Sequence, residues 1–304
     1  MPRETLLAKE KFISGCSMNF NTENNLFRFL YGTLQIIRPV NFIIAFASII
    51  VAGLICIDGQ FLITNIFFAA FSGALVGAAG NIINDYFDLE IDKINRPTRM
   101  LPSGILTPFY TVFLYLLCTI IAFFLSLFIG VEAFTVVLIS SVTIFLYSFR
   151  LKKVVLLGNF VVAFFTGFAF IYGGIAVNNW QFGIIPAVFA FMTNLIRELV
   201  KDIEDIKGDS ANNVITFPQK FGTGKTILLI NILTAILIIF TTIPFFLKIY
   251  RIEYFVIVMV LVNSLFVYLM HSLYKNQSAE NLRRVSNLLK LNMVFGLIAI
   301  FLGK

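Results

Sequence analysis

Histidine, cysteine and charged residues are all scarce in this chain, and each shortage excludes a class of function. His271 is the only histidine, which leaves little room for Ser–His–Asp catalysis or a histidine-rich metal site. Cys16, Cys56 and Cys118 form no CxxC pair, so neither a disulfide framework nor a zinc site is expected. Charged residues make up only 13% of the chain, about half their share of a soluble domain.

Apolar residues take the place of the missing charge. They account for 59% of the 304 residues, with 36 phenylalanines, against about 45–50% in soluble domains. The formal charge is +7, from 23 basic and 16 acidic residues, and the basic residues lie in short loops between apolar runs. This distribution is typical of the positive-inside rule of membrane proteins, and it argues against nucleic acid as a partner.

Nine apolar segments approach the length of about 20 residues that a helix needs to cross a bilayer. Unpaired backbone groups are not tolerated in lipid, so helices are expected rather than an open sheet. The sequence therefore predicts an all-α integral membrane protein with nine transmembrane helices, in a domain spanning residues 28–304. The segments lie near residues 40–57, 62–83, 106–129, 131–148, 154–177, 181–200, 226–247, 252–274 and 287–302.

Loop charge predicts the orientation in the membrane. Basic residues gather before the first segment and after the second, fourth, sixth and eighth. Because Lys and Arg favour the cytoplasmic side, we expect the N-terminus there and Lys304 on the opposite side of the cell membrane. Residues 1–27 are polar and lack the cleavage pattern of a signal peptide, so they are expected to form a cytoplasmic extension.

Three aspartates follow the second segment at helical spacing. Asp85, Asp88 and Asp92 are separated by three and four residues, which would place them on one face of a helix, with Asn84 near the same stripe. Like charges at this spacing repel and destabilise a helix. The arrangement is understandable if a cation lies between the carboxylates.

A second acidic ladder follows the sixth segment and contains Glu198, Asp202, Asp205 and Asp209. Oxygen-only ligands suit Mg²⁺, which typically binds through one or two carboxylates together with substrate phosphates. A single acidic run is more often a solvated surface, but two ladders at matching depth favour a functional site at one membrane face. Basic residues that could neutralise phosphate charge surround them: Arg96, Arg99, Lys152, Lys153, Lys201 and Lys207.

Several strings resemble the motifs of the UbiA family of intramembrane prenyltransferases. They are Asn84-Asp85-x-x-Asp88-x-x-x-Asp92, the string from Arg96-Pro97 to Gly104, Tyr147-Ser148 with Lys152 and Gly158-Asn159, and Lys201-Asp202-Ile203-x-Asp205-x-x-x-Asp209. The resemblance covers residues 28–302 and agrees with nine helices in a UbiA-like bundle. Within the family, the string from Arg197 to Asp209 is most similar to the branch of geranylgeranylglycerol-phosphate geranylgeranyltransferases.

The resemblance implies a Mg²⁺-dependent enzyme that moves an isoprenyl group, expected to be geranylgeranyl, from its diphosphate to an acceptor. It implies catalytic roles for Asp85, Asp88, Asp202 and Asp205, which would bind the metal together with Asp92 and Asp209. It also implies that the diphosphate is held by Asn84, Arg96, Arg99, Lys152, Lys153 and Lys201.

The expected acceptor is the free hydroxyl of a glycerophosphate ether lipid, with Arg197 and Lys201 as candidates for binding its phosphate. These two residues are equally expected to pair with Glu198 or Asp205. The alternative acceptor is an aromatic ring of a quinone precursor. The alternative outside enzymes is a membrane transporter, which is disfavoured because the acids gather at helix ends. No obligate protein partner is indicated.

Overall fold

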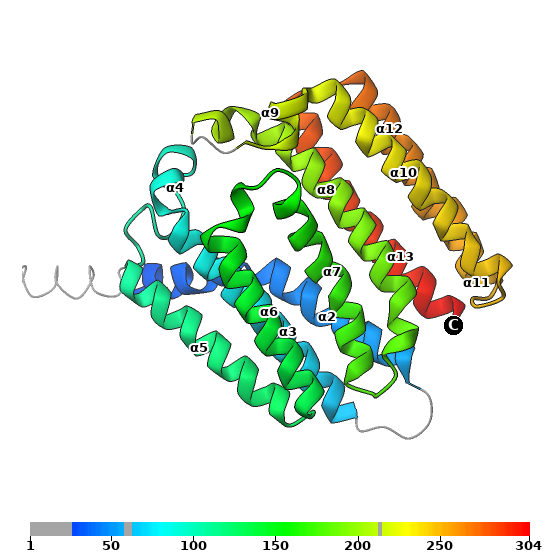
Figure 1. Ribbon diagram of the computed structural model, residues 1–304, viewed down its shortest axis with the longest axis horizontal. Coiled ribbons are helices and arrows are strands. Elements are labelled where there is room, and N and C mark those ends of the chain that lie inside the picture. Colours follow the sequence, from blue (N-terminus) through cyan, green and yellow to red (C-terminus); the bar gives the residue numbers. More distant parts are fainter. Residues whose placement is uncertain (1–25, 58–62, 212–214) are drawn as a thin grey trace, which may run out of the picture.

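The computed structural model describes residues 26–57, 63–211 and 215–304, and the side chains of Asn95, Lys153 and residues 207–211 lie outside the description. The described chain is a bundle of helices (Figure 1). They are Leu26–Ile37, α2 (Pro39–Cys56), α3 (Ile63–Phe87), α4 (Leu89–Asn95), α5 (Pro108–Leu127), α6 (Val131–Phe149), α7 (Leu157–Ile175), α8 (Ile184–Ala211), α9 (Phe217–Phe221), α10 (Thr223–Phe246), α11 (Ile252–Ile257), α12 (Ser264–Lys275) and α13 (Ala279–Gly303). Short 3₁₀ turns at Leu151–Lys153 and Trp180–Gly183 precede α7 and α8, and a π-helical turn, Val258–Asn263, joins α11 to α12.

The prediction of nine membrane spans is confirmed for the described part of the chain, where nine helical segments are long and apolar enough to cross a bilayer. Helix α8 continues to Ala211, beyond the predicted end near residue 200, and α13 begins at Ala279 rather than near residue 287. Its first turns carry Glu280, Arg283 and Arg284, and these charged residues lie outside the apolar run from which the span was predicted. The helix nevertheless begins there because the Ser278 hydroxyl accepts the backbone N–H of Asn281.

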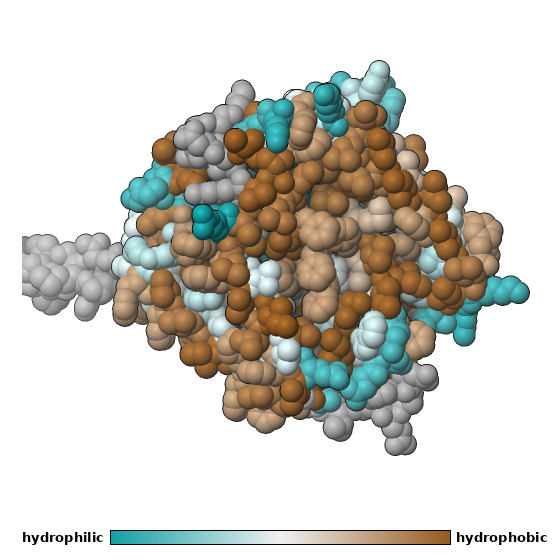
Figure 2. Space-filling view, viewed as in Figure 1, coloured by the Kyte–Doolittle hydropathy of each residue, from teal (hydrophilic) through white to brown (hydrophobic). Residues whose placement is uncertain are grey.

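The outer surface of the bundle is apolar. Large hydrophobic side chains are exposed along every long helix, and the side chain of Phe109 on α5 is 85% exposed. Figure 2 shows a face made mainly of hydrophobic residues, with hydrophilic ones gathered near its edges. Such a large apolar surface is unfavourable in contact with water, but it is compatible with contact with lipid chains. The protein is therefore a multi-pass membrane protein.

The short helices mark the two ends of the bundle. Helices α4 and α9 lie at one end, together with the turn before α7, whereas the turn before α8 and helix α11 lie at the other (Figure 1). Helix α7 packs against α2, α8 packs against α7 and α13, and α3 packs against α2, α5 and α6. The acidic strings at the ends of α3 and α8 are thus brought to the same end.

Close approach of α2 and α7 depends on Gly173. A β-carbon at this position would lie 2.6 Å from Ala52 Cβ and 2.7 Å from the backbone oxygen of Ile49. Both distances are shorter than van der Waals contact, so a larger residue would push the helices apart. At the preceding residue of α7, the Tyr172 hydroxyl hydrogen-bonds Ser72 on α3 at 2.7 Å. These contacts hold α2, α3 and α7 together.

We predict that Gly173→Ala destabilises the protein by about 1–3 kcal/mol, because the added methyl group overpacks the α2–α7 contact. Gly224→Ala on α10 is the matched control, since a β-carbon there meets no atom within 4 Å. It should leave stability unchanged or raise it slightly through helix propensity. Melting curves in detergent measure both effects, and equal melting temperatures for the two variants would contradict the packing argument.

Candidate functional site

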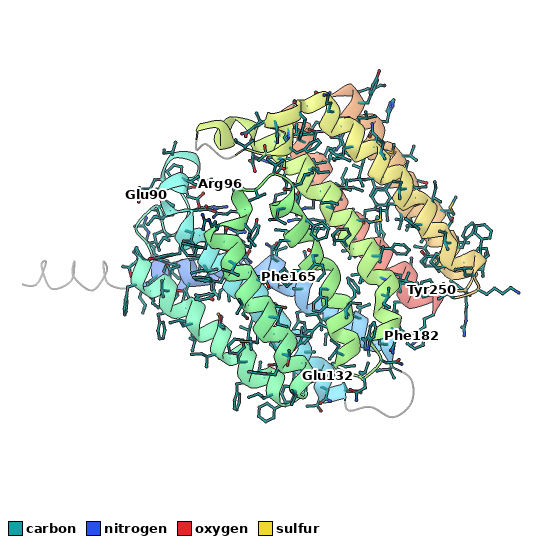
Figure 3. All side chains as sticks on the ribbon, in the orientation of Figure 1. Glu90, Arg96, Glu132, Phe165, Phe182 and Tyr250 are labelled. Carbon is teal, nitrogen blue, oxygen red and sulfur yellow. The ribbon has the colours of Figure 1, made fainter. Side chains whose placement is uncertain are left out.

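A cavity of about 1040 Å³ lies inside the bundle. Helices α2, α3, α6, α7, α8 and α13 contribute to its wall, and α10 to α12 reach it as well. Charged residues from the acidic strings line one part, and apolar and aromatic residues such as Phe165, Phe189 and Leu237 line the rest. Figure 3 shows Arg96 at the α4 end of the bundle, Phe165 near the middle, and Glu132, Phe182 and Tyr250 toward the opposite end.

The first acidic string does not form the single helix that its spacing predicts. Helix α3 ends at Phe87, Asp88 adopts φ −91° and ψ 4°, and α4 begins at Leu89. Two backbone hydrogen bonds still follow the helical pattern, from Asp88 N to Asn84 O and from Asp92 N to Asp88 O. The helical hydrogen-bond pattern therefore continues through the three aspartates, although the backbone conformation departs from a helix at Asp88. The break is understandable, because repulsion among the carboxylates weakens a continuous helix here.

Two arginines hold Asp85 and Asp92. Arg38 donates to Asp85 Oδ1 at 2.6 Å and to Asn81 Oδ1 at 3.1 Å. Arg99 Nη1 lies 3.3 Å from Asp85 Oδ1 and 2.5 Å from Asp92 Oδ2. Burial raises the pKa of the Asp92 carboxyl above its usual value, while Arg99 opposes that rise. The arginine thus favours the ionised form that a metal ligand requires.

The backbone brings both arginines into position. Arg38 lies between the Leu26–Ile37 helix and α2 with φ 57°, so the chain turns sharply just before α2 begins at Pro39. Arg99 lies in a compact turn closed by hydrogen bonds from Ser103 N to Arg99 O and from Leu106 N to Met100 O. Gly104 in that turn has φ 76°, a conformation that glycine adopts without strain. These local folds explain why the string after α4 contains Ser103-Gly104.

Asp88 faces Lys152 across the cavity wall. Lys152 Nζ lies 2.5 Å from Asp88 Oδ1 and 3.2 Å from Asn84 Oδ1, and the Asn84 amide donates to Asp88 Oδ2 at 2.8 Å. Lys152 comes from the 3₁₀ turn between α6 and α7, so a residue 64 positions later in the chain completes this group. Asp88, Asn84 and Lys152 all line the cavity.

The second acidic string lies on one continuous helix, as predicted. Helix α8 runs to Ala211 and carries Glu198, Asp202 and Asp205. Asn159 on α7 donates to Asp202 Oδ2 at 2.8 Å. Arg96, from the segment after α4, lies 3.5 Å from Asp205 Oδ2 and so links the two acidic strings. The predicted site residues Lys153 and Asp209, and also Lys207, have side chains outside the described part of the structure.

Glu198 holds the two basic residues predicted to bind an acceptor. Arg197 Nη1 donates to Glu198 Oε1 at 2.8 Å, and Lys201 Nζ donates to Glu198 Oε2 at 2.9 Å. The expected ion pairs are therefore made with Glu198. Because these three side chains also line the cavity, the pairs do not remove Arg197 or Lys201 from it.

The cavity brings together most of the predicted site residues. Those that line it are Asn84, Asp88, Asp92, Arg96, Arg99, Lys152, Arg197, Lys201 and Asp205. Asp85 and Asp202 are not among the lining residues; Asp85 is 8% exposed and contacts Arg38 and Arg99 beside it.

Two basic residues that line the cavity, Arg38 and Lys290, were not predicted as site residues. Both belong to the loop-charge pattern that predicts orientation, Arg38 before the first span and Lys290 after the eighth. Lys290 also lies within the predicted span 287–302, where a charged residue is a functional candidate by itself. That signal was available in the sequence.

The oxygen-rich wall suits a metal bound together with an anion. Within the described residues, no three His, Cys, Asp or Glu side chains are arranged to hold a metal ion by themselves. Mg²⁺ is seldom bound by a protein cage, and it usually takes one or two carboxylates and completes its shell with substrate phosphates and water. Asp88, Asp92 and Asp205 on the cavity wall fit that donor set.

Comparison with known proteins identifies related sequences. The UbiA prenyltransferase family model matches residues 43–294. A protein of Methanosphaera stadtmanae named digeranylgeranylglyceryl phosphate synthase is 33% identical over 274 residues, which cover 89% of this chain and 98% of that protein. A protein of the same name from Methanocaldococcus jannaschii is 35% identical over 274 residues, with 89% and 95% covered.

Solved structures have the same fold. A structure described as giving insights into the biosynthesis of digeranylgeranylglyceryl phosphate synthase in membranes matches with a TM-score of 0.72 and 34% identity, covering 90% of this chain and 98% of that one. A UbiA homologue from Archaeoglobus fulgidus, bound to DMAPP and Mg²⁺, matches with a TM-score of 0.65 and 17% identity, covering 88% and 98%. At that identity the second likeness concerns the fold alone.

We predict that Asp88→Asn changes how Mg²⁺ affects the binding of inorganic diphosphate. Without Mg²⁺ the variant should bind diphosphate at least as tightly as the original protein, because Lys152 loses its carboxylate partner. With Mg²⁺ it should bind about tenfold or more weakly, because a charged ligand is lost. Calorimetry measures both constants. Glu90→Gln is the control, since Glu90 pairs with Lys93 at the surface. The same Mg²⁺ dependence in Asp88→Asn and the original protein would exclude Asp88 as a ligand.

Proposed function

This chain belongs to the UbiA prenyltransferase family, and we propose that it transfers a geranylgeranyl group from geranylgeranyl diphosphate to the free hydroxyl of a glycerophosphate ether lipid. The observation that carries the proposal is the cavity, whose wall combines two acidic strings at one end of the bundle with a long apolar interior. Such a space suits a substrate with an anionic head and a hydrocarbon chain.

The donor diphosphate binds beside α3 and α4. Asp88 and Asp92 line this part of the cavity, and together with Asp205 of α8, which pairs with Arg96, they would hold Mg²⁺. The metal, when bound, neutralises the diphosphate and stabilises the charge that develops on it as the allylic C–O bond breaks. Arg99 lies against Asp92 and Lys152 against Asp88, where each would bind phosphate oxygens of the donor.

The protein then has to protect an allylic cation from water. Tyr147, Phe165 and Phe189 line the cavity, and their bodies exclude water while their π electrons stabilise positive charge. The acceptor hydroxyl is a weak nucleophile, so it attacks as the cation forms, and its proton leaves to the released diphosphate. A dedicated base is not required for this sequence of events.

The assignment of the acceptor is supported by the relatives. The proteins that share 33% and 35% identity over 89% of this chain are named for the synthesis of digeranylgeranylglyceryl phosphate. Arg197 and Lys201 on the cavity wall also fit an acceptor that carries a phosphate.

We predict that the purified protein converts geranylgeranyl diphosphate and geranylgeranylglyceryl phosphate to the doubly prenylated phosphate in the presence of Mg²⁺. Mass spectrometry identifies the product. Hydroxybenzoate, homogentisate and dihydroxynaphthoate should yield no prenylated ring, and transfer to a ring alone would overturn the acceptor assignment.

Asp88→Ala and Asp202→Ala should each lower the rate by about 100-fold or more, as with other electrostatic catalytic groups. Glu90→Ala, at an exposed position on α4, should stay near the original rate.

We further propose that the N-terminus and the α4–α9 end face the cytoplasm, and that the C-terminus faces the other side of the cell membrane. The basic residues of the loops at that end support this orientation. In a variant without native cysteines, Thr98→Cys and Lys220→Cys should react with an impermeant thiol reagent from the cytoplasmic side. Glu253→Cys should react from the opposite side, because α11 lies at the other end of the bundle (Figure 1). Labelling of Thr98→Cys and Lys220→Cys from different sides would contradict the orientation.

A further inference from the structure

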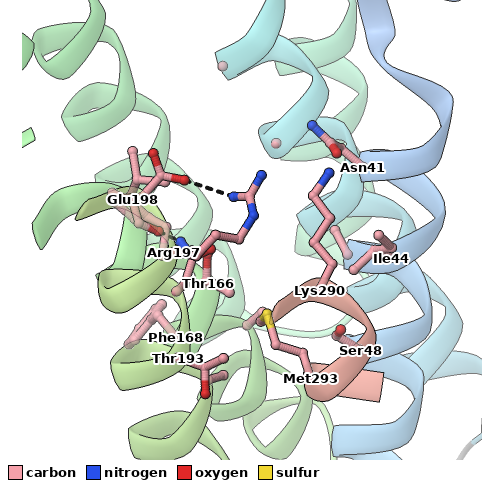
Figure 4. A pocket seen from close by; sticks show the side chains of 18 of the residues that line it. Asn41, Ile44, Ser48, Thr166, Phe168, Thr193, Arg197, Glu198, Lys290 and Met293 are labelled. Atoms are coloured by element: carbon pink, nitrogen blue, oxygen red, sulfur yellow. Dashed lines mark hydrogen bonds and ion pairs between the residues drawn. The ribbon is translucent and has the colours of Figure 1, made fainter. Parts of the chain in front are cut away.

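Lys290 on α13 extends an ammonium group into the cavity without a matching carboxylate. Figure 4 shows its side chain between Asn41 on α2 and Arg197 on α8. Lys290 is partly buried, and it lies near enough to interact with the charges of Arg197, Lys201 and Glu198. The structure records no hydrogen bond or ion pair for Lys290 with any described residue. A lysine at this depth is costly unless a ligand or water satisfies it.

The two sides of the cavity differ in charge. Beside α3 and α4, Arg38, Arg99 and Lys152 face Asp85, Asp88 and Asp92, so positive and negative charges match. Beside α8 and α13, Arg197, Lys201 and Lys290 lie near Glu198, which pairs with Arg197 and Lys201. The other two carboxylates that α8 contributes to the cavity wall, Glu204 and Asp205, pair with Arg283 and Arg96. Three basic residues therefore share one carboxylate on this side. An anionic ligand that brings no metal of its own would balance them.

Arg197 adds a second unmatched donor. Its Nη1 binds Glu198, but its buried Nε has no hydrogen-bond partner in the structure. A buried donor without a partner costs free energy, and a phosphate oxygen can accept from Nε while it also contacts a neighbouring ammonium. Arg197 and Lys290 come from different helices, so one anion between them would bind both.

We propose that Lys290, with Arg197 and Lys201, forms a second anion site that binds the phosphate monoester of the acceptor and selects for a phosphorylated one. The inference rests on the proposed function. A phosphate monoester carries a charge of about −1.5 to −2 at neutral pH, which matches the surplus on this side. The donor diphosphate has its own carboxylates and cations on the α3–α4 side, so each substrate has a separate anchor.

The wall next to Lys290 also suits the lipid chain of the acceptor. Met293, Leu297 and Ile300 follow Lys290 on α13 and line the same cavity. Their spacing places them along one side of the helix. A phosphate held at Lys290 would therefore leave the hydrocarbon chain against an apolar stripe that runs deeper into the bundle.

Steady-state kinetics with Lys290→Gln test the proposal. Geranylgeranyl diphosphate is the donor, and geranylgeranylglyceryl phosphate or its dephosphorylated form, geranylgeranylglycerol, is the acceptor. Loss of a charged contact should raise the KM for the phosphorylated acceptor by about tenfold to 100-fold. The KM for the donor should change less than about twofold, since its site lies on the other side of the cavity. The KM for the dephosphorylated acceptor should be the same in both proteins.

Two further variants separate the proposed role from general damage. Lys290→Arg keeps the charge and should recover most of the affinity for the phosphorylated acceptor. Lys275→Gln removes an exposed lysine from α12 and should behave as the original protein. An unchanged acceptor KM in Lys290→Gln, a matching rise in donor KM, or an equal loss with the dephosphorylated acceptor would each overturn the inference. If the original protein made no product from the phosphorylated acceptor, the proposed function itself would fail, and the inference with it.

Discussion

An ionised side chain inside an apolar bundle needs an opposite charge, hydrogen bonds or water, because transfer from water into a medium of low polarity is costly. This constraint organises the α4–α9 end of the molecule. Arg38 from the start of α2 and Arg99 from the turn after α4 meet at Asp85, and Lys152 from the turn before α7 meets Asp88. Segments far apart in the sequence are held together by these pairs, and the cavity remains open between them.

The same pairs prepare the cavity for an anion. Arg99 and Lys152 already lie in the cavity wall and are already partly desolvated, so an arriving phosphate would replace a carboxylate as their partner rather than a full shell of water. On the proposed function, the released carboxylates would then be available to a metal that arrives with the phosphate. Charges arranged before the substrate binds need little reorganisation as charge develops, and this is a major source of electrostatic catalysis.

The features that were predictable from sequence are those that depend on local pattern. Nine long apolar runs specify the spans, and the spacing of Glu198, Asp202 and Asp205 specifies one face of α8. The contacts of Arg38 and the break at Asp88 depend on how distant segments pack, which neither periodicity nor loop charge contains. The likeness between the two acidic strings suggested two equivalent ladders. The structure shows the first interrupted at Asp88 and the second continuous along α8.

On the proposed function, the difference in charge between the two sides of the cavity would also let two anionic substrates bind in one cavity without exchanging places. A balanced wall attracts an anion only when a metal accompanies it, as Mg²⁺ accompanies a diphosphate. A wall with surplus positive charge attracts a phosphate monoester directly and repels the metal. Lys290 gives the α8–α13 side that surplus, whereas on the α3–α4 side Asp88 would take up a cation once a phosphate engages its partner Lys152. The distribution of charge would therefore set which substrate binds where, and would place the acceptor hydroxyl between the two anchors, beside the bond that breaks.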